Sequence, residues 1–119
     1  DINALSVHGT DTPYNDEMEA IAIHRAHMHE VPILAFKGYN GHTMGAAGVL
    51  ETILTMLALE NGTLIGNPRY EACGTSYALN ITKEHRSLGK LPMHFIKIMS
   101  GFGGCNAAIR LSYCGCDEL

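Results

Sequence analysis

Three short stretches of this 119-residue chain combine glycine with side chains that could do chemistry: 8–12 (HGTDT), 37–48 (KGYNGHTMGAAG) and 101–106 (GFGGCN). They supply two histidines, His8 and His42, and one lysine, Lys37. Imidazole N–H and backbone N–H groups are the usual donors to an oxyanion that develops on a carbonyl group. Glycine lets the backbone approach a ligand closely. The residue types therefore predict a site for carbonyl chemistry.

The elements that must position these residues alternate between strand and helix. Apolar runs predict strands, helical spacing of apolar residues predicts helices, and Asn61-Gly62 is a helix stop signal. Residues 62–76 and 83–89 are expected to be irregular or polar connections. The order strand, helix, strand, helix and then late strands predicts one α/β domain over 1–119 with a mixed sheet. The predicted strands are 2–7, 31–36, 77–81, 95–99 and 107–113, and the predicted helices are 17–29 and 43–59.

The three glycine stretches each follow a predicted strand. In open α/β sheets, ligands bind beyond the carboxyl ends of the strands. We therefore expect the three loops to meet, so that the two histidines and the lysine converge on a slot with glycine walls.

His42 precedes the predicted helix 43–59. The free N–H groups and the positive end of the helix dipole disfavour a positive charge there. A histidine in this place should be neutral near pH 7 and act as an N–H donor. The alternative is a histidine that only caps the helix, and His8 considered alone is more often structural than catalytic.

Composition limits the other possibilities. The formal net charge is −4, so the chain has no basic field for nucleic acid, and no apolar run reaches the roughly 18 residues of a membrane span. Four cysteines without a small disulfide scaffold favour reduced thiols, and the start of the sequence does not resemble a signal peptide, so we expect a cytoplasmic location.

His24, His27 and His29 could suggest a metal site, but a solvated helix surface is the preferred interpretation, and no metal is expected. Cys105 is expected to be a small core residue.

Three blocks of the sequence carry a family resemblance. They are HGTDTPYND (8–16), with Glu19 following, KGYNGHTMGAAGVLE (37–51) and GFGGCNAAI (101–109). In order and content they resemble the C-terminal half of the β-ketoacyl synthases, the thiolase-fold condensing enzymes of fatty-acid and polyketide synthesis. The resemblance covers essentially the whole chain and implies the C-terminal half of a thiolase-like fold.

The resemblance also implies roles for individual residues. His8 and His42 match the active-site histidines of the Cys-His-His subclass, which hydrogen-bond the thioester carbonyl of malonyl-carrier during decarboxylation. Lys37 matches the lysine near the second histidine, and Glu51 matches its buried acidic partner. The substrate-binding positions implied are Thr10 and Thr12 for the phosphopantetheine arm, and Phe102 and Gly103 beside the nucleophile.

The implied activity is a decarboxylative Claisen condensation by a 3-oxoacyl-(acyl carrier protein) synthase. No bound cofactor is expected, since the phosphopantetheine arm of an acyl carrier protein carries the substrate. The nucleophilic cysteine of the family lies in its N-terminal half, and none of the four cysteines here has its context. Two alternatives remain: a malonyl decarboxylase or chain-length partner subunit without that cysteine, and a half-domain that only binds or scaffolds a partner.

The predicted helix 43–59 is apolar on nearly all sides. A helix of this kind is usually buried against other parts of a protein on every side. At about 25 cal/mol per Å² of apolar surface, leaving several of its side chains in water would cost several kcal/mol. We therefore expect residues 1–119 to be inactive alone and to need the N-terminal half of the synthase, on the same or a separate chain, in a homo- or hetero-oligomer.

Overall fold

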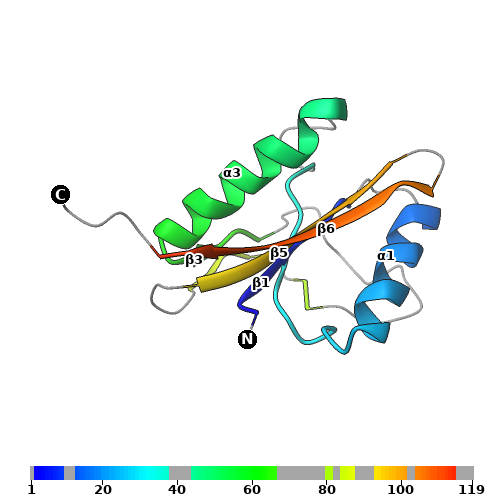
Figure 1. Ribbon diagram of the computed structural model, residues 1–119. Coiled ribbons are helices and arrows are strands. Elements are labelled where there is room, and N and C mark those ends of the chain that lie inside the picture. The colour runs from blue at the N-terminus through cyan, green and yellow to red at the C-terminus, as the bar shows by residue number, and fades with distance from the viewer. Residues whose placement is uncertain are drawn as a thin grey trace.

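The computed structural model describes residues 2–9, 13–37, 44–66, 80–81, 84–87, 93–101 and 104–114. Its centre is a four-stranded mixed sheet with the strand order β2-β1-β5-β6 (Figure 1). Strands β2, β1 and β5 are parallel to one another, and β6 is antiparallel to β5. The predicted mixed α/β sheet is therefore confirmed. In sheet order the strands are β2 (Ile33–Leu34), β1 (Ala4–Ser6), β5 (Met93–Ser100) and β6 (Asn106–Tyr113).

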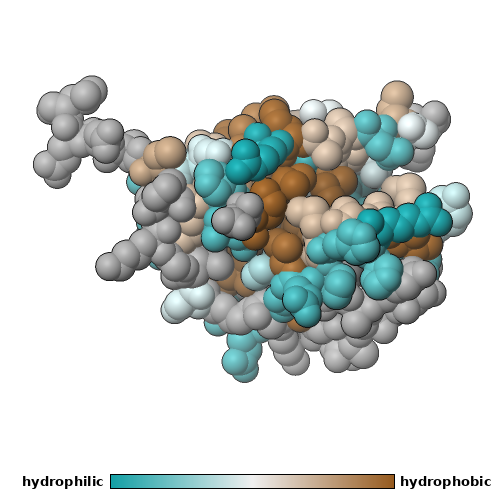
Figure 2. All heavy atoms as spheres, turned by 60° about the horizontal axis from the view of Figure 1, so that its bottom comes forward, coloured by the Kyte–Doolittle hydropathy of each residue, from teal (hydrophilic) through white to brown (hydrophobic). Residues whose placement is uncertain are grey.

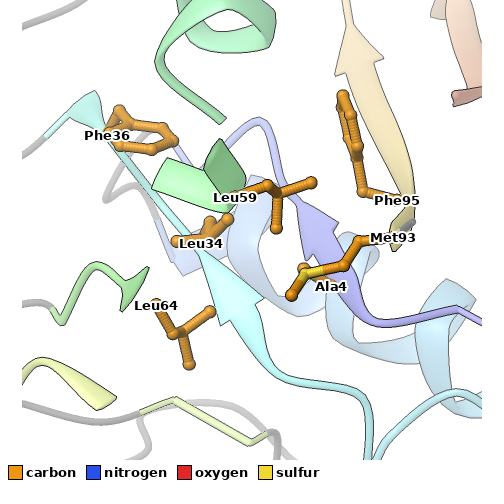
Figure 3. Close-up of a cluster of buried hydrophobic side chains, with 7 residues drawn as sticks. All are labelled: Ala4, Leu34, Phe36, Leu59, Leu64, Met93 and Phe95. Atoms are coloured by element: carbon orange, nitrogen blue, oxygen red, sulfur yellow. The ribbon is translucent and has the colours of Figure 1, made fainter. Parts of the chain in front are cut away.

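In the described part of the chain, helices α1 (Pro13–Arg25) and α3 (Ala47–Glu60) lie on opposite sides of this sheet (Figure 1). Side chains alternate between the two faces of a strand, so neighbouring residues belong to different cores. Ala4 belongs to the cluster that contains Leu59 of α3, whereas Leu5 belongs to the cluster that contains Ile23 of α1. Figure 3 shows the first cluster, which consists of Ala4, Leu34, Phe36, Leu59, Leu64, Met93 and Phe95.

Helix α1 differs from the prediction in its bounds and in its buried face. It begins at Pro13 rather than at residue 17, and it ends at Arg25 rather than at residue 29. Proline is favoured in a first helical turn, and His27, with φ 59°, cannot continue the helix. In the sequence, Met18, Ile21, Ala22 and Met28 have the spacing of one helix, but Ala22 is exposed. The buried residues of α1 are instead Glu19, Ala20 and Ile23.

Helix α3 begins at Ala47, after a short 3₁₀ turn, η1 (Met44–Ala46), and so starts later than the predicted 43–59. It ends at Glu60 with Asn61 as its C-cap, which confirms the predicted stop signal. Two short strands were missed by sequence reasoning, β3 (Thr63–Leu64) and β4 (Arg86–Ser87). They form an antiparallel pair, and two-residue strands are too short for any alternation to be read in the sequence.

One surface of the sheet layer is apolar and uncovered. On α3, Val49 is 66% exposed, Ile53 49% and Leu57 48%, and on β6 Ile109 is 54% exposed. A hollow of about 460 Å³ separates the two elements. Apolar side chains also gather in the middle of the face drawn in Figure 2, with hydrophilic side chains around them. Among the described residues, no helix has both the length and the apolar character needed to cross a membrane.

Candidate active site

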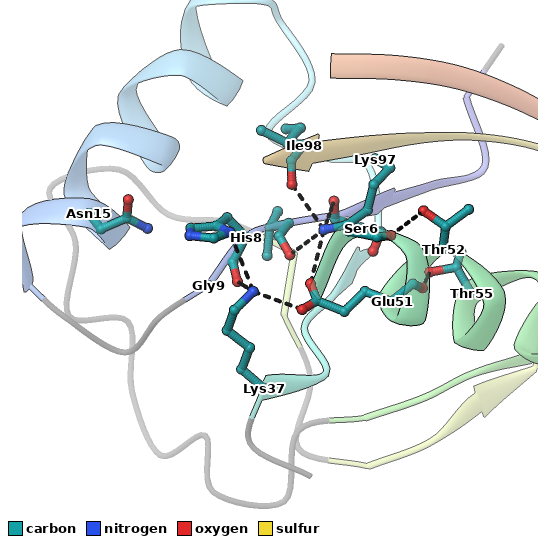
Figure 4. Close-up of polar contacts among 12 residues, drawn as sticks. Ser6, His8, Gly9, Asn15, Lys37, Glu51, Thr52, Thr55, Lys97 and Ile98 are labelled. Carbon is teal, nitrogen blue, oxygen red and sulfur yellow. Dashed lines mark hydrogen bonds and ion pairs between the residues drawn. The ribbon is translucent and has the colours of Figure 1, made fainter. Parts of the chain in front are cut away.

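Glu51 of α3 is the centre of a buried charge cluster (Figure 4). Its side chain is fully buried, and each of its carboxylate oxygens meets a different lysine. Oε2 lies 2.8 Å from Nζ of Lys37, and Oε1 lies 3.0 Å from Nζ of Lys97. The two lysines come from different segments of the chain, because Lys37 lies after β2 and Lys97 lies within β5. The carboxylate therefore ties helix α3 to two parts of the sheet.

The Lys37 ammonium connects Glu51 to His8. It donates to the backbone oxygen of His8 at 2.6 Å, and its Nζ lies 3.4 Å from Nδ1 of the His8 ring. An ammonium has three donors and no acceptor, so Nδ1 can only accept in this contact. An imidazole that accepts at Nδ1 carries its proton at Nε2. The contact thus favours a neutral His8 that can act as an Nε2–H donor.

Glu19 of α1 binds the backbone at His8. Its two carboxylate oxygens accept hydrogen bonds from the backbone N–H groups of His8 and Gly9, at 2.7 and 2.8 Å. Gly9 has φ +50°, a left-handed conformation that side chains disfavour. Burial raises the pKa of Glu19, and the two backbone hydrogen bonds oppose that effect. The carboxylate fixes the turn that ends β1 and therefore the position of the imidazole.

Lys97 is buried in a cage of oxygen atoms, with 2% of its side chain exposed. Besides Glu51, its Nζ donates to the backbone oxygens of Val7 and Ile98, at 3.1 and 2.9 Å, and lies 3.4 Å from the backbone oxygen of Ser6. Burial lowers the pKa of Lys97, Lys37 lowers it further, and Glu51 opposes both. Two lysines and two carboxylates thus balance in charge around His8.

Of the two histidines and one lysine that were expected to converge, the structure brings His8 and Lys37 together, and Glu51 lies beside Lys37. His8 follows β1 and Lys37 follows β2, and since these strands are parallel, their carboxyl ends lie side by side. Glu51 reaches both of these residues from α3, through Lys37. The other predicted site residues lie outside the described residues, and they are Thr10, Thr12, His42, Phe102 and Gly103.

Sequence reasoning missed Lys97 and gave no role to Glu19. A signal for Lys97 was present, because it stands two and four residues after Phe95 and Met93 on one face of β5. A lysine in phase with buried apolar residues of a strand predicts a buried cation. Glu19 had no comparable signal, because its partners are backbone groups of another element.

The other polar residues singled out in the sequence lie away from this cluster. The rings of His24 and His29 lie 5.3 Å apart, and the described part of the chain contains no group of three or more potential ligands that could hold a metal ion. Cys105 is exposed, so its assignment to the core was wrong. It lies in the turn between β5 and β6, where its backbone oxygen accepts from Gly101 N–H at 2.7 Å and its side chain meets no core.

Comparison with known sequences identifies relatives of this chain. The model of the family described as "Beta-ketoacyl synthase, C-terminal domain" matches residues 1–71. The chain is 37% identical over 113 residues to 3-oxoacyl-[acyl-carrier-protein] synthase 1 of Escherichia coli, covering 91% of this chain and 27% of that protein. It is 33% identical over 122 residues to 3-oxoacyl-[acyl-carrier-protein] synthase 2 of Coxiella burnetii, covering 93% and 27%. The chain therefore spans about a quarter of the length of these relatives.

Solved structures give the same answer for the fold. A β-ketoacyl synthase from Burkholderia phymatum superposes with a TM-score of 0.84 at 26% identity, over 96% of this chain and 28% of that one. Ketosynthase twelve of the bacillaene polyketide synthase from Bacillus amyloliquefaciens superposes with a TM-score of 0.85 at 21% identity, over 96% and 23%. The sheet is thus of the ketosynthase type, and the family match covers more than half of the sequence. The chain belongs to the β-ketoacyl synthase C-terminal domain family.

Proposed function

We propose that this chain is the C-terminal catalytic part of a cytoplasmic 3-oxoacyl-(acyl carrier protein) synthase that performs decarboxylative Claisen condensation. The observation that carries the proposal is the contact of the Lys37 ammonium, held by buried Glu51, with both the ring and the backbone of His8. This contact favours the N–H donor that a developing enolate oxygen needs. Membership of the family supports the reaction type.

In this proposal, His8 donates from Nε2 to the thioester carbonyl of a malonyl group on the carrier's phosphopantetheine arm, and His42 donates to the same oxygen. The bond to the carboxylate breaks, carbon dioxide leaves, and the electron pair forms an enolate held by the two N–H groups. The enolate carbon then attacks an acyl thioester on the nucleophilic cysteine of the N-terminal half, and the cysteine leaves as a thiolate. Thr10 and Thr12 are assigned to binding of the arm, and Phe102 and Gly103 to the substrate-binding region beside the nucleophile.

The partner of the uncovered apolar surface is, in the same proposal, the remaining part of the synthase. Val49, Ile53 and Ile109 are about half exposed or more, and they lie on both sides of the hollow between α3 and β6. Monomeric proteins rarely leave a contiguous apolar patch of this kind in water. The relatives are about four times longer than this chain, which leaves ample polypeptide to cover it.

The test uses the complete synthase that contains these residues, with malonyl-carrier and an acyl thioester. His8→Ala should lower the rate of carbon dioxide release by about 100-fold or more, the loss typical of an oxyanion donor. His94→Ala is the matched control, because His94 is a half-buried histidine on β5 whose Nδ1 lies 2.7 Å from the hydroxyl oxygen of Ser112. Equal rates for the His8 variant and the wild type would refute the assignment.

Product analysis in the same assay separates the alternatives. A condensing synthase releases carbon dioxide and 3-oxoacyl product in equal amounts, whereas a decarboxylase subunit releases carbon dioxide alone. A protein that only scaffolds a partner releases neither. Purified residues 1–119 should release neither product without the rest of the synthase, and turnover by this chain alone would contradict the proposed dependence.

A further inference from the structure

Lys97 is connected to His8 through Glu51 and Lys37. Its ammonium lies within 3.4 Å of four oxygen atoms, three from the backbone and one from Glu51. Transfer of an ammonium from water into a protein interior costs several kcal/mol unless such partners replace its hydration. The cage therefore holds the charge at a fixed place, against β1 on one side and α3 on the other.

This fixed charge determines how Glu51 is oriented. Lys97 takes Oε1 of the carboxylate, which leaves only Oε2 for Lys37. Lys37 therefore has one donor on Glu51 and keeps its other donors for His8. Without the Lys97 ammonium, the carboxylate could turn and present both oxygens to Lys37. That rotation would draw the Lys37 ammonium away from His8.

We propose that Lys97 is a positioning residue, whose buried ammonium orients Glu51 and, through Glu51, sets the contact between Lys37 and His8. The charged and titratable groups around it come from every element packed there: Glu51 on α3, Lys37 after β2, His8 after β1 and Glu19 on α1. The effect on rate rests on the proposed function, whereas the effect on geometry does not.

The first experiment measures kinetics of malonyl decarboxylation by the complete synthase with Lys97→Met, which keeps an unbranched side chain and removes the charge. We expect kcat per folded active site to fall by about 10- to 100-fold, as for a displaced catalytic group, with KM within about 3-fold of the wild type. Arg110→Met is the matched control, because Arg110 is an exposed cation on β6. An unchanged kcat for Lys97→Met would overturn the proposal.

The second experiment restores the charge without the side chain. Lys97→Ala leaves a space lined by four acceptors, and ammonium ion has the donors to fill it. Ammonium chloride should raise the Tm and the decarboxylation rate of this variant, and both increases should be several-fold larger than those of the wild type. Tetramethylammonium chloride is the control, since it has the charge but no N–H donor. Equal effects of the two salts would contradict the inference that the oxygen atoms around Lys97 bind an N–H donor.

A structure of the Lys97→Met variant provides the decisive geometric readout. We expect Glu51 to have rotated and Nζ of Lys37 to have left the His8 oxygen, whereas an unchanged Lys37 position overturns the inference. If the wild-type synthase does not turn over malonyl-carrier, the proposed function fails, and the Tm and structural results still decide the role of Lys97.

Discussion

Replacement of Glu51 with glutamine tests the physical basis of the candidate site. The substitution keeps the size and shape of the side chain and removes the negative charge between Lys37 and Lys97. Both ion pairs are short, at 2.8 and 3.0 Å, and the Glu51 side chain is fully buried. We expect the free energy of unfolding at pH 7 to fall by about 3–5 kcal/mol, as is typical when one partner of a buried ion pair is removed.

The magnitude follows from two opposing effects. At an effective dielectric constant of about 20, a charge pair at these distances is attractive by about 6 kcal/mol. The desolvation cost of several kcal/mol per ion offsets much of this attraction in the wild type. In the variant, the attraction is lost and the cost for Lys97 stays, because its side chain is 2% exposed. Since a domain has about 5–15 kcal/mol of total stability, the variant would retain only part of it.

The pH dependence of this loss has a definite sign. Burial already lowers the pKa of Lys97, and Glu51 is the main group that opposes this effect. Without Glu51 the pKa falls further, so the unfolded chain binds more protons than the folded one between that lowered value and the ordinary 10.5. Stability rises with pH wherever the unfolded state binds more protons. The wild type gains stability in the same way only above its own Lys97 pKa, so the difference between Glu51→Gln and the wild type should shrink as the pH rises from the pKa of Lys97 in the variant to its pKa in the wild type.

The assay is urea-induced unfolding followed by far-UV circular dichroism at several pH values. Glu60→Gln provides the matched control, because Glu60 lies on the same helix and is exposed. The double variant Glu51→Gln/Lys97→Met should lose less stability than the sum of the two single variants, since it removes one charge of each sign. The reasoning is refuted if Glu51→Gln costs less than about 1 kcal/mol, the range of an exposed ion pair.

Three further predictions concern the surroundings of the site. Glu19→Gln removes a carboxyl group whose pKa is raised in the folded chain. In the wild type, protonation of Glu19 stabilises the folded state below pH 4.5, and this stability is lost as the pH rises towards the folded pKa. A pH titration of unfolding should show that Glu19→Gln lacks this contribution. Gly9→Ala should cost about 1 kcal/mol in urea unfolding, because alanine is strained at φ +50° although its Cβ would meet only ordinary contacts, and no change would show that the turn relaxes freely. Ile53→Glu with Leu57→Glu should reduce self-association of the isolated chain in sedimentation velocity and abolish its assembly with the rest of the synthase; unchanged assembly would show that this face is not the interface.

The sequence determined which residues carry chemistry and roughly where the main elements lie. His8 and Lys37 could be chosen because glycine-rich stretches follow strands, whereas Glu51 was implied only by the family resemblance. The parallel strands bring the ends of β1 and β2 together. The mixed sheet followed from the order of the apolar runs. Periodicity failed for α1, where the buried face contains Glu19, because a buried carboxylate that binds backbone N–H groups breaks the apolar pattern.

Only the tertiary structure showed that Glu51 serves two lysines and that Lys97 is one of them. Lys97 and Glu51 are 46 residues apart, and their contact depends on the pairing of β5 with β1 and on the packing of α3 over that pair. Local patterns report propensity and burial, but they do not report which buried charges face each other. That choice is made when strands pair and helices pack, since a buried ammonium is stable only where several elements together supply its acceptors.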